Sequence, residues 1–279
     1  MINILFCGND YVFDGILTTT LSILKRSDNI DPLNIYIYTM DVTHLNKNYF
    51  PISDKKVKFL EDEIKKYNSH NKITKIDVTD LYMEHFSKCP NEGAYCSPYT
   101  LIRLLADLIP GMPDKLLYLD ADLMFNKDIH LLYDIDVEGY EYASARDHYG
   151  KYLINPNYIN AGVLLFNMKY SKETKLFEKA RNWLKKKKLV FADESALYRA
   201  TSKKKMIAQK FNDQKFLWKN RTVVRHFSKR LFYLPYPHTA NIKQWQVSQI
   251  HKVFHYYYFD DIFYEYIYLK RKFEEENKE

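Results

Sequence analysis

Three observations predict an α/β fold built on a mainly parallel sheet. Apolar runs of strand length lie at residues 2–7, 33–39 and 73–78. Amphipathic segments of helical length separate these runs. Further along the chain, apolar runs end in acidic or small polar residues. Strands that alternate with helices in this way usually pair in parallel, with helices on the faces of the sheet.

The composition is that of a globular protein with one large domain or two small ones. The 279 residues are 46% hydrophobic and 28% charged, which is ordinary for such a protein. Tyr (25) and Phe (17) are unusually frequent, whereas only 7 Gly and 9 Pro are present. We therefore expect an ample core and no long flexible linker.

The formal net charge of +7 comes partly from lysine clusters at residues 185–188 and 203–205. Such clusters are usually solvated faces, although they also attract phosphate-bearing substrates or an anionic membrane surface. No pattern typical of a nucleic-acid-binding module occurs, so we expect no nucleic-acid partner.

The cysteines and the chain start indicate a cytoplasmic protein. Cys7, Cys89 and Cys96 are odd in number and lack C-x-x-C spacing, which argues against a disulfide framework or a zinc knuckle. The chain starts on a strand-like segment without a signal-like region, and no apolar run is long enough to cross a bilayer. We expect a cytoplasmic protein, at most peripheral at the inner face of the membrane.

The first strand, residues 2–7, is broken by Gly8, Asn9 and Asp10, and leucines at helical spacing follow. Strand, turn and helix at the N-terminus are how many nucleotide-binding domains begin. The glycine-rich phosphate loops G-x-G-x-x-G and G-x-x-x-x-G-K-S/T are both missing. A bound diphosphate would therefore need another source of positive charge, and a metal ion is the obvious substitute.

A strand at 33–39, a helix at 53–67 and a strand at 73–78 follow, and Ser97-Pro98 begins another helix. Arg103 in this helix lies off the leucine stripe. It either pairs with Asp107 on the surface, as i and i+4 neighbours do, or is a rigidly held cation that is available to a ligand. Spacing alone favours the surface pair.

The stretch 116–129 carries the strongest chemical signal. An apolar strand at 116–119 is followed by Asp120 and Asp122, with Ala121 between them. Residues two apart on an extended backbone point the same way, so both carboxylates face one spot at a strand end. A hard divalent cation suits that concentration of charge, and the alternative is an acidic turn.

More polar residues follow the later strands. A strand at 142–147 ends in Asp147, and Asn160, Ala161 and Gly162 begin an apolar strand at 160–167. Gly162 indicates either close approach of the backbone to a ligand or tight packing. His226 lies near the end of a strand at 222–227.

The remaining segments are predicted helices. A lysine-rich helix spans 171–187, and Asp193-Glu194 opens another, where acids either suit the helix dipole or face a sugar. The tail at 254–273 contains many Phe and Tyr residues and reads as an amphipathic helix. Packing on the domain is the favoured role for this helix, and lying on a membrane interface is the alternative.

Asp120, Asp122 and His226 together form a candidate metal site. The metal would act as a Lewis acid on a pyrophosphate leaving group. One imidazole among carboxylates moves the preference from Mg²⁺ towards Mn²⁺, with Mg²⁺ as the alternative. Lys243 could add a second positive charge at the phosphates.

The order of these segments resembles glycosyltransferase family 8. The resemblance runs over about residues 2–245 and rests on LFCGND, SPYTLIRL, LLYLDADLMFNKDI, YINAGVLLFN, FADESAL, RHF and KQW. It implies a GT-A fold, with a Rossmann-like mixed sheet flanked by helices. It also implies retaining transfer of glucose or galactose from a UDP-sugar, with Mn²⁺, to a glycan, glycoprotein or glycolipid. Residues 1–245 would be the catalytic domain and 246–279 a helical aromatic and basic appendix.

The resemblance also implies a role for each matching residue. Asp120, Asp122 and His226 match the metal ligands, and Asp193 and Glu194 match the pair beside the reacting sugar. The residues that match the nucleoside-binding positions are Cys7, Gly8, Asn9, Asp10 and Ala121. Arg103 matches the donor-binding arginine, and Lys243 matches the lysine at the diphosphate. The residues that match the donor-sugar pocket are Asp147, Asn160, Ala161 and Gly162.

The sequence departs from the family pattern in several places. The usual D-Q pair is Asp193-Glu194 here, and a glutamate could stabilise an oxocarbenium ion or attack it. His226 lies far from Lys243, which makes His238 a rival third ligand. Asn9 replaces an expected Asp. These departures keep an alternative open, a non-catalytic UDP- or glycan-binding protein on a degenerate transferase fold.

Overall fold

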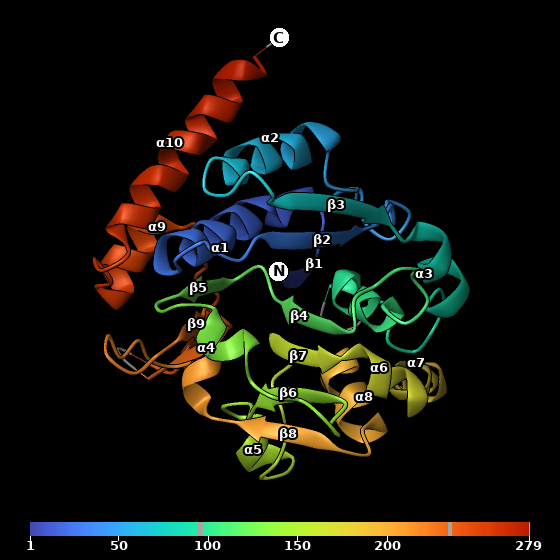
Figure 1. The fold of residues 1–279 in the computed structure, drawn as a ribbon. Coiled ribbons are helices and arrows are strands. Elements are labelled where there is room, and N and C mark those ends of the chain that lie inside the picture. The colour runs from blue at the N-terminus through green and yellow to red at the C-terminus, as the bar shows by residue number, and fades with distance from the viewer. Residues whose placement is uncertain (94–96, 234–235, 279) are drawn as a thin grey trace.

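A computed structural model describes residues 1–93, 97–233 and 236–278 (Figure 1). Cys96 therefore lies outside the described residues. The central sheet has seven strands in the order β3-β2-β1-β4-β7-β6-β8. The strands are β1 Ile2–Cys7, β2 Leu33–Thr39, β3 Lys72–Asp77, β4 Lys115–Leu119, β6 Tyr142–Ala145, β7 Val163–Asn167 and β8 Lys204–Ile207. Only β7 runs antiparallel to its neighbours, so the expected mixed α/β sheet is confirmed.

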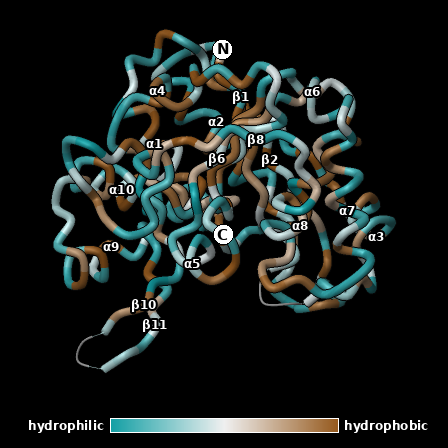
Figure 2. The backbone as a smooth tube through the Cα atoms, turned by 90° about the horizontal axis from the view of Figure 1, so that it is seen from below, coloured by the Kyte–Doolittle hydropathy of each residue, from teal (hydrophilic) through white to brown (hydrophobic). Residues whose placement is uncertain are grey.

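Two small sheets flank the central one. Strand β5 (Leu123–Phe125) pairs antiparallel with β9 (Val224–His226) directly after the two aspartates of the D-A-D stretch. Strands β10 (Arg230–Phe232) and β11 (His238–Ala240) form a hairpin that projects from the body of the molecule in Figure 2.

Helices cover both faces of the central sheet. Side chains alternate between the two faces along each strand, and both faces are apolar. On β1, Ile4 and Phe6 belong to one apolar core and Leu5 to the other. The first core is covered by α1 (Phe13–Arg26), α2 (Asp54–Lys65) and α10 (Asp260–Glu276). The second is covered by α3 (Thr79–His85), the 3₁₀ helix η2 (Pro98–Leu105), α7 (Leu176–Lys186) and α8 (Ala192–Ala200).

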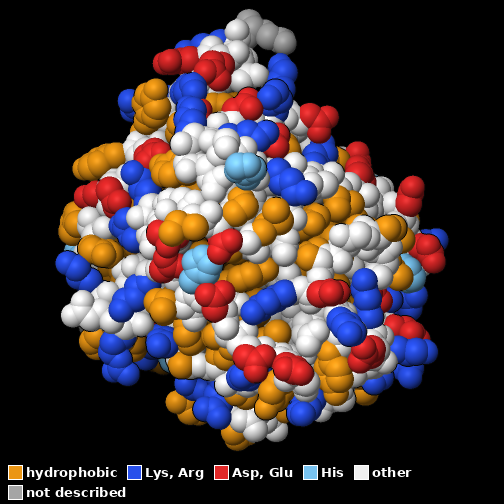
Figure 3. Space-filling view, in the orientation of Figure 1, with side chains coloured by type: hydrophobic (Ala, Val, Ile, Leu, Met, Phe, Trp, Pro, Cys, Tyr) orange, Lys and Arg blue, Asp and Glu red, His pale blue; other side chains and the backbone are white. Residues whose placement is uncertain are grey.

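The other helical segments are short and connect these layers. They are η1 Asp10–Val12, α4 His130–Tyr133, α5 Gly150–Leu153, α6 Met168–Glu173, η3 Gln209–Phe211, α9 Val247–Gln249 and the π-helical η4 Ile250–Phe254. On the face shown in Figure 3, acidic and basic side chains are interspersed, so the net positive charge is not gathered there.

Two expectations about helices need correction. The predicted helix at 171–187 is two helices, α6 and α7, because Lys175 adopts a left-handed conformation (φ 55°, ψ 38°) between them. The favoured surface pair of Arg103 with Asp107 is also wrong. Arg103 is buried, and Asp107 instead accepts hydrogen bonds from Arg181 of α7 at 2.5 and 3.0 Å.

The aromatic tail packs on the domain through α10. Ile262, Phe263, Tyr266 and Leu269 are buried in the same core as α1. Arg26 of α1 donates two hydrogen bonds of 2.8 Å to Asp261, a bidentate pair at the start of α10. Among the described residues, no helix combines the length and apolarity that a bilayer crossing requires.

Candidate active site

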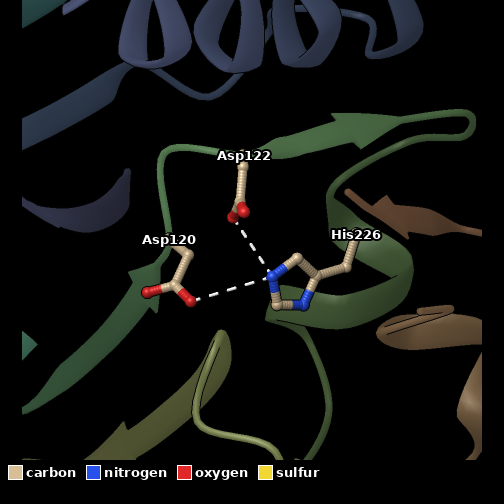
Figure 4. A group of neighbouring side chains, drawn as sticks. All are labelled: Asp120, Asp122 and His226. Atoms are coloured by element: carbon tan, nitrogen blue, oxygen red, sulfur yellow. Dashed lines mark ion pairs between the residues drawn. The ribbon is translucent and has the colours of Figure 1, made fainter. Parts of the chain in front are cut away.

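Three candidate metal ligands meet where β4 and β9 end (Figure 4). His226 Nε2 lies 3.1 Å from Asp122 Oδ1 and 3.8 Å from Asp120 Oδ2. The pairing of Leu123 with His226 across β5 and β9 brings the imidazole opposite the aspartates. Two backbone hydrogen bonds of 2.8 Å hold the segments that carry these ligands. Asp120 N donates to Gly162 O, and Phe227 N donates to Asp122 O. One ligand atom from each residue lies within 4.8 Å of the others.

A chain of amides orients the His226 ring. The Gly162 N–H donates to Asn160 Oδ1 at 3.0 Å, so that atom must be the amide oxygen. Asn212 therefore donates its Nδ2 to Asn160 Oδ1 (2.8 Å) and turns its Oδ1 towards His226 Nδ1 (2.9 Å). An amide oxygen there requires a proton on Nδ1, so Nε2 is the nitrogen that faces the two aspartates and is available to a metal ion.

Positive charge balances the aspartates on two sides. Lys243 Nζ donates to Asp122 Oδ2 and also to Phe227 O at 3.2 Å. Burial would raise the pKa of Asp122, but the charges of Lys243 and His226 outweigh it and hold that pKa far below its usual range. Asp120 Oδ1 accepts hydrogen bonds from Tyr118 Oη (2.6 Å) and Arg103 Nη2 (3.3 Å).

Arg103 is the buried centre of this charge network. Its guanidinium stacks on the Tyr118 ring at 4.0 Å, and its Nη1 donates to Ala161 O at 2.5 Å. Its Nε donates to Thr100 O at 2.8 Å and lies 3.2 Å from Asp193 Oδ2. Only 2% of the Arg103 surface is exposed, so it holds three segments of the site in place rather than standing free.

A cavity of about 200 Å³ opens beside the aspartates. Among the expected nucleoside-side residues, Cys7, Gly8, Asn9 and Ala121 line it, together with Lys243. The rest of the cavity is lined by Val12, Ser97, Tyr99, Thr100, Tyr118, Asp120, Asp122 and Trp245. Burial raises the pKa of Cys7, which keeps it a neutral thiol.

Asp10 is not part of this lining. Its carboxylate pairs with Lys56 of α2 at 2.5 Å and faces a neighbouring hollow between α1, α2 and α10. Its neighbour Asn9 donates from Nδ2 to Asn48 O at 3.2 Å.

The expected sugar-side residues form a second cluster, next to the aspartates. Glu194 Oε2 accepts hydrogen bonds from Ala161 N (3.0 Å) and Asn160 Nδ2 (3.3 Å). Asn160 Nδ2 also donates to Asp147 Oδ2 at 2.9 Å. Burial, followed by the charge of Asp147, raises the pKa of Glu194 well above its usual value. Burial also raises the pKa of Asp193, against the lowering effect of Arg103.

His238 lies away from the metal ligands. It stacks on Phe232 across the β10–β11 hairpin, with ring centroids 5.5 Å apart, and its Nδ1 lies 2.8 Å from Tyr236 O. Within residues 1–93, 97–233 and 236–278, the three-ligand group contains His226 and not His238.

Sequence reasoning missed several residues that shape the site. Asn212 carried no local signal, since it lies 14 residues before His226 in an irregular segment. Gln244, between Lys243 and Trp245, is fully buried and donates to Ala121 O at 2.8 Å. Tyr118 was read as part of an apolar strand, although its hydroxyl contacts Asp120.

Known proteins resemble this chain in sequence and in fold. A glycosyltransferase of Haemophilus influenzae is 28% identical over 195 residues, which cover 66% of this chain and 54% of that protein. Glycosyltransferase GlyA of Streptococcus pneumoniae is 29% identical over 176 residues, covering 63% of this chain and 22% of GlyA. The chain thus spans about half of the first relative and about a fifth of the second.

Solved structures show the same fold. The galactosyltransferase LgtC, in complex with donor and acceptor sugar analogues, superposes with a TM-score of 0.64 at 18% identity, covering 81% of this chain and 86% of LgtC. The glycosyltransferase GlyE of Streptococcus pneumoniae gives 0.60 at 17% identity, covering 95% of this chain and 63% of GlyE. The fold is therefore GT-A. The model of glycosyl transferase family 8 matches residues 3–213, and the chain belongs to that family.

Proposed function

We propose that this protein is a retaining hexosyltransferase that uses UDP-glucose or UDP-galactose and Mn²⁺. The acceptor would be a glycan, glycoprotein or glycolipid. The observation that carries the proposal is the group of Asp120, Asp122 and His226 beside a cavity at the ends of parallel strands. Membership of the family supports glycosyl transfer in general.

The residues present fit a divalent metal ion. Two carboxylates and a neutral imidazole nitrogen form a donor set that suits Mn²⁺ better than Mg²⁺ or Ca²⁺. Gly162 leaves the space open, since a Cβ there would lie 2.4 Å from His226 Cε1 and 2.9 Å from Asp120 Oδ2. When bound, the metal would stabilise the negative charge that develops on the leaving diphosphate.

Lys243 is suited to share that task. It already neutralises one metal ligand, Asp122, and its ammonium lines the cavity. A diphosphate in the cavity would offer Lys243 an alternative anion of higher charge. No glycine-rich loop is present to do the same through backbone amides.

Glu194 and Asp193 are the proposed pair at the sugar. Burial and the charge of Asp147 raise the pKa of Glu194, so it holds a proton more readily than an ordinary carboxyl and, when protonated, can donate a hydrogen bond to a sugar hydroxyl. In its ionised form, the Glu194 carboxylate would stabilise a positive charge that grows at the anomeric carbon. Asp193, held beside Arg103, would bind sugar hydroxyls.

The test is release of UDP from UDP-glucose and UDP-galactose, with Mn²⁺ and with EDTA. We expect turnover with Mn²⁺ only, and a loss of about 100-fold or more in Asp122→Asn, because metal stabilisation of the leaving group contributes several kcal/mol. The matched control is Asp62→Asn, which alters a half-exposed carboxylate on α2. Undiminished turnover in EDTA or in Asp122→Asn would rule out the metal mechanism.

A second candidate is a UDP- or glycan-binding protein without turnover. The glutamate at position 194, where the family pattern has glutamine, motivates it. Metal-dependent binding of UDP-sugar with no UDP released, even slowly and with glycan acceptors added, would favour this candidate over the transferase.

A further inference from the structure

A second hollow, of about 290 Å³, lies beside the sugar-side residues, between α5, η3 and the loop at 215–222. Its lining is strongly basic and contains Lys151, Lys210, Lys215 and Arg221. Among the residues that the structure describes, none of these four cations forms an ion pair with a carboxylate. Positive charge gathered in a concave surface without counter-charges attracts anionic ligands.

The one acid in the lining does not neutralise the hollow by pairing with a cation. Asp213 Oδ1 accepts hydrogen bonds from the backbone N–H groups of Lys215 (3.1 Å) and Phe216 (2.8 Å). Its Oδ2 accepts one from Thr222 Oγ1 at 3.1 Å. The carboxylate is therefore committed to holding the loop at 215–222 in shape.

That loop also presents two aromatic rings. Phe216 and Trp218 are 43% and 57% exposed, and their centroids lie 5.6 Å apart. Trp218 N donates to Thr222 Oγ1 at 2.9 Å, so the loop that carries the rings is closed by side-chain hydrogen bonds. Exposed aromatic rings beside cations can bind both parts of a charged sugar: the rings pack against its apolar face, and the cations bind its charged group.

The hollow shares a wall with the candidate active site. Asp213 O accepts a hydrogen bond from the backbone N–H of His226 at 2.9 Å. His148, which follows Asp147 in the chain, donates its N–H to Gln214 Oε1 at 3.0 Å. A chain-like ligand held in the hollow would therefore end near Asp147, beside the residues proposed to hold the donor sugar.

We propose that this hollow binds the acceptor, and that the acceptor is an anionic glycan carrying phosphate or carboxylate groups; this rests on the proposed function. The cations hold the anionic groups, and Phe216 and Trp218 pack against sugar rings. The charged hollow thereby selects an acidic acceptor over a neutral one and aims its end at the transferred sugar.

The test is a binding titration of the whole chain with no donor present. Three oligosaccharide probes of equal length are compared by calorimetry: phosphorylated dextran, oligogalacturonate and neutral dextran. We expect one or both acidic probes to bind more tightly than neutral dextran, with an affinity that falls as salt is added. The two acidic probes distinguish a phosphate-bearing acceptor from a carboxylate-bearing one.

Charge reversal tests the location of binding. Lys215→Glu with Arg221→Glu should weaken binding of the acidic probe about tenfold or more, as expected when two attractive contacts become repulsive. The matched control is Lys186→Glu with Lys188→Glu, which changes the net charge equally at the end of α7, away from α5 in Figures 1 and 2. Both double variants should melt near the wild-type temperature, since they alter solvent-facing side chains.

Two results would overturn the proposal. One is equal affinity for neutral and acidic probes, and the other is an equal loss of affinity in both double variants. With donor and Mn²⁺ added, transfer to the acidic probe should fall in the hollow variant and persist in the control. If the wild type releases no UDP but still binds the acidic probe through the hollow, the transferase proposal fails while the anion site stands.

Discussion

At the scale of single residues, the candidate metal ligands depend on side chains that are not metal ligands themselves. His226 faces the aspartates through Nε2 because Asn212 accepts a hydrogen bond from its other nitrogen. Asn212 is in turn held by Asn160, whose amide also reaches Asp147 and Glu194. A single amide chain thus joins the metal side of the site to the sugar side.

We expect Asn212→Ala to weaken Mn²⁺ binding about 10- to 100-fold, as is typical when the partner that orients a metal-bound histidine is removed. The ring of His226 would then rotate or change tautomer. Calorimetric titration with Mn²⁺ measures the effect, and His226→Ala sets the upper limit of the loss. An unchanged dissociation constant in Asn212→Ala would show that packing alone orients the ring.

Glu194 gives a pH-dependent prediction. Its pKa in the folded protein is raised by burial and by the charge of Asp147. As pH rises above the usual carboxyl pKa, the unfolded chain releases this proton while the folded chain retains it, so stability falls with pH. Glu194→Gln removes that penalty.

The melting temperature of Glu194→Gln should therefore exceed that of the wild type by a margin that grows from acidic to neutral pH. The comparison is made on ligand-free protein by thermal denaturation at several pH values. Glu173→Gln, an exposed change on α6, serves as the control and should leave the melting temperature unchanged. A margin that is constant across the pH range would contradict a raised pKa of the buried Glu194.

At the scale of elements, local pattern predicted most helices and strands, and long-range pairing decided the rest. The leucines of α1 and the Ser97-Pro98 start of η2 were readable because capping and periodicity are local. The burial of Arg103 was not, because its partners come from distant parts of the chain, such as Ala161, which lies 58 residues away. Polar residues at strand ends could be predicted to form a site. The contact of Asn212 with His226 could not, because only the tertiary fold brings these two residues together.

The docking of α10 is a prediction at this scale. Phe263 is fully buried in the core that α1 shares, whereas its neighbour Tyr264 is 64% exposed. We expect Phe263→Ala to lower the free energy of unfolding by about 3–5 kcal/mol, the usual cost of emptying a buried aromatic site. Tyr264→Ala should cost no more than about 0.5 kcal/mol. Chemical denaturation measures both, and equal losses would mean that α10 is not docked as described.

At the scale of the whole molecule, the site is assembled from segments that span nearly the entire chain. Cys7 ends β1 and Gly8 follows it, the two aspartates lie between β4 and β5, His226 ends β9, and Lys243 lies in the segment before α9. The central sheet and the β5–β9 pair bring these segments together, and α10 packs on the same core as α1. A ligand that bridges them should therefore stabilise the fold as a unit.

Binding of Mn²⁺ should consequently raise the melting temperature of the whole chain. At 100 times the dissociation constant, linkage adds about 2.7 kcal/mol to the free energy of unfolding, which corresponds to about 5–10 °C for a domain of this size. Mg²⁺ at equal concentration should shift it less, because one ligand is an imidazole. Asp122→Asn should abolish most of the shift by removing a carboxylate ligand. An equal shift with Mg²⁺, or a full shift in Asp122→Asn, would place the stabilising ion elsewhere than at Asp120, Asp122 and His226.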